Sequence, residues 1–83
     1  MSLPKADILN HLTKELLDMK PDLQDKVNAD KHFMWELGLD SLDITEFIAR
    51  TEQHFRIEIP DDIWRDLDNL DKIADYLIAQ THD

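Results

Sequence analysis

The serine at position 41 is the side chain whose surroundings point most directly to chemistry. It stands in the tripeptide Asp40-Ser41-Leu42, shortly after Gly38, where a helix is expected to begin. An exposed hydroxyl in a first helical turn could carry a phosphodiester, because free N–H groups and the positive dipole end gather there, an arrangement worth roughly 0.3–1 kcal/mol. We expect exposure because the inward-facing stripe is predicted to begin at Leu42 and Ile44. A serine also suits a helix start for structural reasons alone, so this tripeptide does not decide its role.

The other reactive side chains do not form a catalytic or metal-binding pattern. The chain has no cysteine, so it cannot form a disulfide, and any thioester chemistry needs a thiol from a cofactor. His11 and Glu15 share a helical face but offer two metal ligands at most, too few for zinc. The segment Gly38-Leu39-Asp40-Ser41 is not a G-x-S-x-G elbow, and no strand precedes it. We therefore predict no catalytic residue and no metal site. All four histidines are predicted to lie on the surface: His11, His32, His54 and His82.

Length and charge narrow the class of protein further. A chain of 83 residues is expected to form one domain, residues 1–83. Its 19 acidic residues against 9 basic ones give a net charge of −10, which repels nucleic acid and anionic membranes and favours partners with basic patches. The acidity could also serve solubility alone. A calcium-binding hand is not indicated, because the alternating oxygen ligands of its loop are missing. The first residues lack an apolar run, so we expect a cytoplasmic protein.

Helical periodicity predicts a small all-α bundle of three main helices and one short helix. Pro21 bars continuation of the first helix, for which Ser2 is a candidate N-cap. A long loop then separates the first two helices, and Val27, Phe33 and Leu37 could pin it to the core. Ile57 or Ile59 should point inward from an extended connector, and Asn69 or Asp68 should cap the last helix. The predicted helices span residues 3–19, 40–55, 61–67 and 70–80.

Buried stripes can be assigned to these helices from their three- and four-residue spacing. Asp40 is the expected N-cap of the second helix, and Asp43 stands where an acidic side chain supports a capping box. The stripes are Ile8, Leu9, Leu12, Leu16 and Met19 in the first helix, Ile44, Phe47, Ile48, Thr51 and Phe55 in the second, and Leu70, Ile73, Ala74 and Leu77 in the last.

The stretch Glu36-Leu37-Gly38-Leu39-Asp40-Ser41-Leu42-Asp43 resembles the phosphopantetheine attachment motif of acyl carrier proteins. The resemblance extends from Phe33 to Ile78, while before Phe33 only the amphipathic pattern agrees. Asp40 and Asp43 favour acyl over peptidyl carriers, and the intact Ser41 argues against a degenerate carrier fold. Further matching positions are Glu46, Phe47, Phe55, Ile57, the run Glu58-Ile59-Pro60-Asp61, Ile73, Tyr76 and Leu77.

This resemblance implies a carrier that is not itself an enzyme. A phosphopantetheinyl transferase would move 4′-phosphopantetheine from coenzyme A to the Ser41 hydroxyl, with Asp40 and Leu42 flanking the attachment point. The terminal thiol of the arm would then hold acyl groups as thioesters, which fits a chain without cysteine. The expected partners are acyl-loading enzymes, ketosynthases and other acyl-processing enzymes of fatty-acid, polyketide or related biosynthesis. A chain that starts at Met1 and ends just after the last helix is expected to be a free-standing, monomeric carrier.

The resemblance also implies a docking surface on the second helix. Complementary charge there would steer basic partners and orient them more than it would deepen affinity. Arg50, His54 and Arg56 dilute the acidity at the lower end of this helix, so we expect partners that differ from those of a general fatty-acid carrier. The predicted contact residues are Asp40, Asp43, Glu46, Glu52, Asp61 and Asp62, with Glu58 extending the patch.

Carriers of this family can shelter the acyl chain beside the second helix. We expect the bulk of Trp64 and the hydroxyl of Thr51 to make such a pocket unsuited to long saturated chains, although these side chains could equally be ordinary core. Trp35 is either a docking anchor or a ring that lies on the protein's own surface. The residues expected to border the pocket are Phe47, Ile48, Thr51, Ile59, Trp64, Leu67 and Ile73.

Overall fold

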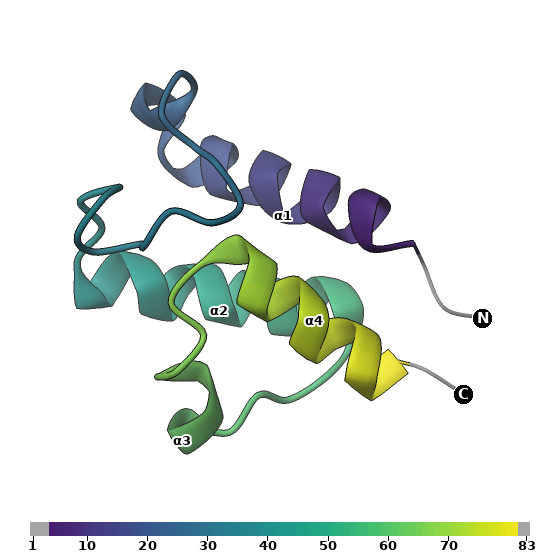
Figure 1. The fold of residues 1–83 in the computed structure, drawn as a ribbon. Helices are drawn as coiled ribbons and strands as arrows, with labels where there is room; N and C mark the ends of the chain where they lie inside the picture. The colour runs from purple at the N-terminus through teal and green to yellow at the C-terminus, as the bar shows by residue number, and fades with distance from the viewer. Residues whose placement is uncertain (1–3, 82–83) are drawn as a thin grey trace.

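Three long helices and one short helix form the architecture seen in the computed structural model, which describes residues 4–81 (Figure 1). The predicted all-α class is confirmed, and no strand occurs in the described residues. Within that range no helix is long and apolar enough to cross a membrane. In chain order the elements are α1 (Lys5–Met19), a 3₁₀ turn η1 (Pro21–Leu23), α2 (Ser41–Phe55), α3 (Asp61–Trp64) and α4 (Leu70–Thr81).

Helix ends differ from the predicted ones where local hydrogen bonding departs from α-helical spacing. Helix α1 begins at Lys5 instead of residue 3, and the Pro4 carbonyl accepts the first amide bonds; the candidate cap Ser2 lies outside the described residues. Helix α3 ends at Trp64 instead of residue 67, because the amides of Asp66 and Leu67 bond three residues back, the tighter 3₁₀ pattern. Helix α4 starts as predicted, with the Asn69 side chain accepting from the Lys72 amide at 2.8 Å.

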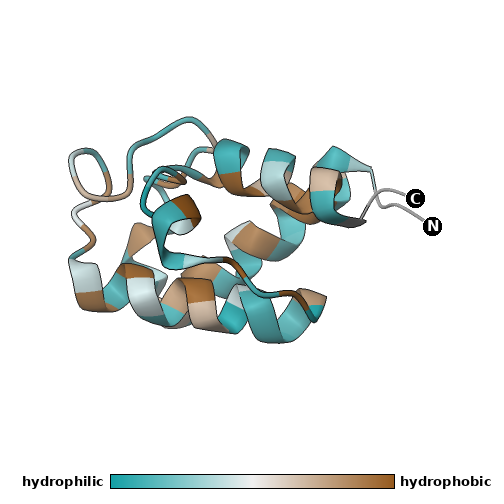
Figure 2. Cartoon of the chain, turned by 90° about the horizontal axis from the view of Figure 1, so that it is seen from below, coloured by the Kyte–Doolittle hydropathy of each residue, from teal (hydrophilic) through white to brown (hydrophobic). Residues whose placement is uncertain are grey.

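The core lies where α1 packs against both α4 and α2. Figure 2 shows apolar and polar residues alternating along the long helices, as expected for amphipathic helices that share one core. The predicted stripe of α4 is completely buried, whereas Leu9, Met19, Ile44 and Phe55 of the other stripes are only half-buried. The fully buried members of the predicted stripes are Ile8, Leu12, Leu16, Phe47, Ile48, Thr51, Leu70, Ile73, Ala74 and Leu77.

The long connection between α1 and α2 is pinned to the rest of the fold. Phe33 and Leu37 are buried as predicted, Val27 is half-buried, and Ile59 is the inward-pointing isoleucine of the later connector. The Phe33 amide donates to the Asp68 carbonyl at 2.9 Å, and its ring meets Phe47 edge to face. These contacts fix the segment that leads into Ser41. Two further buried anchors, Leu23 and Leu39, were not among the predicted ones.

Candidate functional site

The start of α2 is set by a reciprocal pair of capping bonds, as the sequence predicted. Asp40 is the N-cap; its Oδ1 accepts from the Asp43 amide at 2.8 Å, and Asp43 Oδ2 accepts from the Asp40 amide at 3.3 Å. Gly38 lies just upstream with φ of +73°, a conformation that residues with a Cβ rarely adopt. Together these features set the point where the loop ends and α2 begins, so that Ser41 is the first helical residue.

Ser41 is exposed, and so is its neighbour Leu42. The prediction that the inward stripe begins at Leu42 is wrong: that side chain is 78% exposed. Residues two apart on a helix do not share a face, so a stripe through Ile44, Phe47 and Ile48 turns Leu42 toward solvent. The hydroxyl and the apolar side chain therefore stand together on the outside of the first turn.

The N-terminus of α2 offers amide groups that a phosphodiester could use. The Asp43 amide is satisfied by Asp40 and the Ile44 amide by the Asp40 carbonyl. Among the described residues, the amides of Ser41 and Leu42 have no partner, and they lie at the positive end of the helix dipole. An exposed hydroxyl beside free donors fits an attached phosphopantetheine arm, whose phosphate would be the acceptor.

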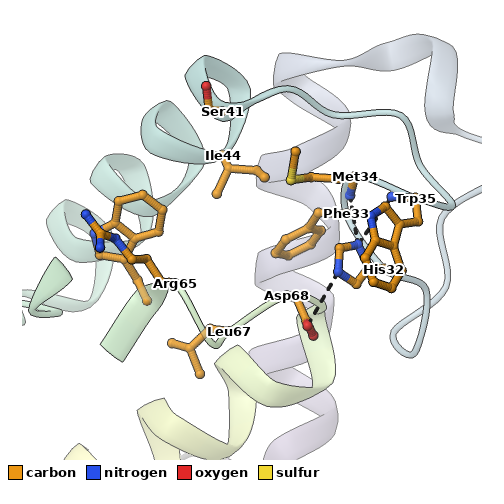
Figure 3. A pocket seen from close by; sticks show the side chains of 10 residues that line it. His32, Phe33, Met34, Trp35, Ser41, Ile44, Arg65, Leu67 and Asp68 are labelled. Atoms are coloured by element: carbon orange, nitrogen blue, oxygen red, sulfur yellow. Dashed lines mark hydrogen bonds and ion pairs between the residues drawn. The ribbon is translucent and has the colours of Figure 1, made fainter. Parts of the chain in front are cut away.

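A cavity of about 290 Å³ opens beside Ser41 (Figure 3). Its walls come from the loop before α2, the first turn of α2 and the segment joining α3 to α4, and they are mainly apolar. In Figure 3, Ser41 stands at one edge, the aromatic side chains of the loop form one wall, and Arg65 and Leu67 stand opposite. The lining residues are His32, Phe33, Met34, Trp35, Ser41, Ile44, Trp64, Arg65, Leu67 and Asp68.

Two of the residues expected to border an acyl pocket, Trp64 and Leu67, line this cavity. The other five are packed in the core: Phe47, Ile48, Thr51, Ile59 and Ile73. The hydroxyl of Thr51 is buried but satisfied, since it donates to the Phe47 carbonyl at 2.9 Å. Trp64 is half-buried, and its Nε1 donates to Asp61 Oδ1 at 3.0 Å, so the indole also braces the short helix α3.

His32 ties the loop wall of the cavity to the segment before α4. Its Nδ1 accepts from the amides of Met34 and Trp35 at 3.1 and 3.2 Å, while its Nε2 faces Asp68 Oδ2 at 3.4 Å. The Lys72 ammonium, hydrogen-bonded to Asp68 at 2.9 Å, holds the pKa of that carboxyl below its usual value. These contacts therefore connect the loop wall of the cavity to the segment before α4.

The prediction that all histidines are surface residues needs one correction. His32 is half-buried because the fold uses both of its nitrogens, a role that only the tertiary arrangement reveals. His11 and His54 are exposed, with ring centroids 5.0 Å apart, and His82 lies outside the described residues. No group of three or more metal-ligating side chains is found within residues 4–81.

Sequence reasoning missed most of the cavity wall. The length of the loop and the bulk of Trp35 were visible signals, but Arg65 and Asp68 reach the site only through the packing of a distant segment. The half-buried Ile44 packs against the core as predicted and also lines the cavity, which was not predicted.

The acidic residues predicted to form a docking surface have unequal freedom. Asp40, Glu46, Asp61 and Asp62 are exposed. Asp43 is half-buried, held in the capping box and 3.6 Å from the Lys20 ammonium. Glu52 is also half-buried, and its Oε2 accepts from the Ile59 amide at 2.7 Å, so it braces the connector after α2. The exposed members are the ones available to a partner.

The sequence matches the family model described as "Phosphopantetheine attachment site" over residues 7–77. It is 43% identical over 63 residues to the acyl carrier protein of Bdellovibrio bacteriovorus, covering 76% of this chain and 77% of that protein. It is 30% identical over 79 residues to the acyl carrier protein of Tropheryma whipplei strain Twist, covering 95% and 96%. The mitochondrial acyl carrier protein of Neurospora crassa is 42% identical over 62 residues, or 68% of this chain; the match spans only 46% of that relative.

The fold comparison agrees with the family match. A solution structure described as that of "a putative acyl carrier protein from Anaplasma phagocytophilum" superposes with a TM-score of 0.83 at 22% identity and covers 100% of this chain and 98% of that one. Members of the matched family bear a covalent 4′-phosphopantetheine and act as carriers, not as enzymes. The capped helix start, the exposed Ser41 and a family match over residues 7–77 lead to one conclusion: this chain belongs to the acyl carrier protein family.

Proposed function

We propose that Ser41 is the attachment point of the arm and that the chain carries acyl groups to biosynthetic enzymes. The observation that supports this most strongly is the exposed hydroxyl at the first position of α2, beside unpartnered amides. In the loading reaction the Ser41 oxygen attacks the phosphorus of coenzyme A that bears the pantetheine. The bond to 3′,5′-adenosine bisphosphate breaks, and the hydroxyl proton passes to a base of the transferase. Once attached, the arm supplies the thiol that forms acyl thioesters.

Intact mass spectrometry tests this assignment. The apo chain is incubated with coenzyme A and a broad-specificity phosphopantetheinyl transferase. Wild type should gain the mass of one phosphopantetheine, and Ser41→Ala should gain none. Ser2→Ala is the matched control, because the chain contains only these two serines. An unmodified wild type, or a modified and folded Ser41→Ala, would refute the assignment.

The partners are proposed to dock on the exposed acidic side of α2 and α3. Asp40, Glu46, Asp61 and Asp62 are the exposed carboxylates there, and a basic patch on a transferase, ketosynthase or acyl-loading enzyme would be steered toward them. Asp43 and Glu52 would contribute to the negative electrostatic field while they hold the helix and the connector in place.

We place the carrier, as a monomer of one domain, in cytoplasmic fatty-acid, polyketide or related biosynthesis.

The acyl chain is proposed to enter the cavity beside Ser41, with Trp64 and Leu67 at its side and the core residues Phe47, Ile48, Thr51, Ile59 and Ile73 behind them. Those five side chains are at most 4% exposed, so a long chain would have to displace packed groups, at about 1–3 kcal/mol for overpacking. Short chains should therefore be preferred. Amide spectra of the octanoyl and palmitoyl forms test this: core shifts that grow steadily with chain length would contradict it.

A further inference from the structure

Trp35 is the most exposed large apolar side chain in the described part of the fold, at 84%. One face of the ring stacks on His32 and the rest is open, so the exposed fraction does not decide between the two predicted roles, a docking anchor and a ring on the protein's own surface. Trp64, in contrast, is half-buried and hydrogen-bonded. A single exposed apolar residue is ordinary, so exposure alone assigns no role to Trp35. Two other features indicate a role for Trp35: its indole is held by a neighbouring side chain, and it lies at the cavity beside Ser41.

The indole of Trp35 is held in place from one side. Its ring stacks on the imidazole of His32, with centroids 4.3 Å apart and planes 8° apart. That imidazole is itself fixed by the amides of Met34 and Trp35 and by the adjacent Asp68. An aromatic side chain fixed before binding loses little conformational entropy when a partner covers it, which is what makes such residues effective anchors.

The position of Trp35 selects the kind of partner. Trp35 and Ser41 line the same cavity (Figure 3). Enzymes that act on the loaded thioester work at the far end of the arm. The transferase must instead bring its catalytic groups to the Ser41 oxygen itself. Its contact surface on the carrier therefore has to include the residues around that cavity.

The charge around the indole indicates what surface would accept it. Glu36 and Asp40, which both follow Trp35 in the chain, are exposed carboxylates, and the whole chain carries a net charge of −10. Met34, the preceding residue, is also exposed and adds apolar surface to the cavity. The complement of this face is an apolar socket with a basic rim.

We propose that Trp35, positioned by His32, is an anchor that inserts into a basic-rimmed apolar socket on the phosphopantetheinyl transferase. The proposal rests on the proposed function, because it assumes that a transferase modifies Ser41. In this arrangement the transferase contacts Trp35, an apolar side chain on the loop side of Ser41, in addition to the acidic side chains of α2. Two contacts on either side of the hydroxyl would fix the orientation in which it is presented.

Steady-state kinetics of arm attachment test the anchor. The transferase encoded in the same genome is assayed with apo wild type, Trp35→Ala, Trp35→Phe and His32→Ala. Trp35→Ala should raise the KM for the carrier by about tenfold or more, with kcat nearly unchanged, because the contact is the same in the ground and transition states. Trp35→Phe should restore most of the loss, and His32→Ala should raise KM by a few-fold. His11→Ala, an exposed histidine of α1 outside the proposed docking surface, is the control and should match wild type.

A spectroscopic measurement makes the proposal independent of turnover. With 5-fluorotryptophan in both positions, the Trp35 ¹⁹F resonance, assigned from Trp35→Phe, should shift or broaden on adding transferase. Unchanged KM in Trp35→Ala, or an unmoved Trp35 resonance, overturns the anchor. A Trp35 shift that depends on carrier concentration without transferase would show that a second copy covers the indole, which also overturns it. If wild type gains no arm at all, the proposed function fails instead.

Discussion

At the scale of single residues, the site depends on two residues with positive φ, a backbone conformation that is unfavourable for residues with a Cβ. Two described residues have positive φ: Gly38 at +73°, before α2, and Arg56 at +57°, directly after it. Glycine adopts this region freely, whereas other L-residues are penalised there by about 1–2 kcal/mol. Helix α2 therefore begins after a residue suited to its conformation and ends at one that is not.

Single substitutions at these two positions should change the free energy of unfolding in opposite directions. Arg56→Gly should stabilise the fold by about 0.5–1 kcal/mol, because glycine is favoured at a left-handed helix end. Gly38→Ala should destabilise it by about 1 kcal/mol for conformational reasons only, since a Cβ there meets nothing within 4 Å. Urea unfolding measures both. Two shifts of the same sign would contradict this explanation.

At the scale of elements, the first turn of α2 has both a structural and an electrostatic role. Asp40 caps the helix and is also an exposed acid next to Ser41. Asp68 similarly links elements: its carboxylate joins Lys72 of α4 to His32 of the loop. Substitutions that keep the shape but remove the charge can separate the two roles.

Asp40→Ala and Asp40→Asn should differ in stability. Alanine removes the acceptor for the Asp43 amide and should cost about 1 kcal/mol, whereas asparagine is an equally good N-cap and should cost only a few tenths. Both variants lose the charge, so both should raise the KM for arm attachment if the acid steers the transferase. Chemical denaturation and the same kinetic assay give the two results. Equal stability losses would argue against the capping role.

Asp68 should make the fold sensitive to acid. Its pKa is lowered in the folded protein, chiefly by the hydrogen bond to Lys72. The carboxylate therefore contributes stability above the unfolded pKa of about 3.9, and the contribution is lost as pH falls through the lower folded value. Asp68→Asn should flatten the fall in stability below about pH 4. Asp66→Asn, an exposed neighbour, is the control; a profile for Asp68→Asn as steep as wild type would contradict the prediction.

At the scale of the whole molecule, a net charge of −10 opposes compaction while it attracts basic partners. Added salt should therefore have two opposite effects. Between low and physiological ionic strength, stability to urea should rise as self-repulsion is screened. Over the same range kcat/KM for arm attachment should fall, mainly through the association rate. A kcat/KM that does not change with salt would mean that charge does not guide docking.

The sequence predicted the features of the fold that follow from local periodicity and capping. The α4 stripe, the Asp40–Asp43 capping box and the anchors Phe33 and Leu37 are all where spacing placed them. The errors have two causes. Leu42 was assigned inward although its helical phase, a local property, turns it outward. The contact between His32 and Asp68 depends on tertiary packing, because the two residues are 36 positions apart in the chain. The cavity wall could not be predicted, because packing brings Arg65 and Asp68 to it.

The central claim is that one hydroxyl, that of Ser41, bears the arm. Fragment-ion mapping of the modified chain tests it most directly, because cleavage after Lys31 and Arg50 releases a peptide whose only hydroxyl side chains are Ser41 and Thr45. We predict that the added mass lies on fragments that contain Ser41 and is absent from fragments that contain Thr45 without Ser41. Added mass on Thr45, or on any other peptide of the chain, would contradict the claim.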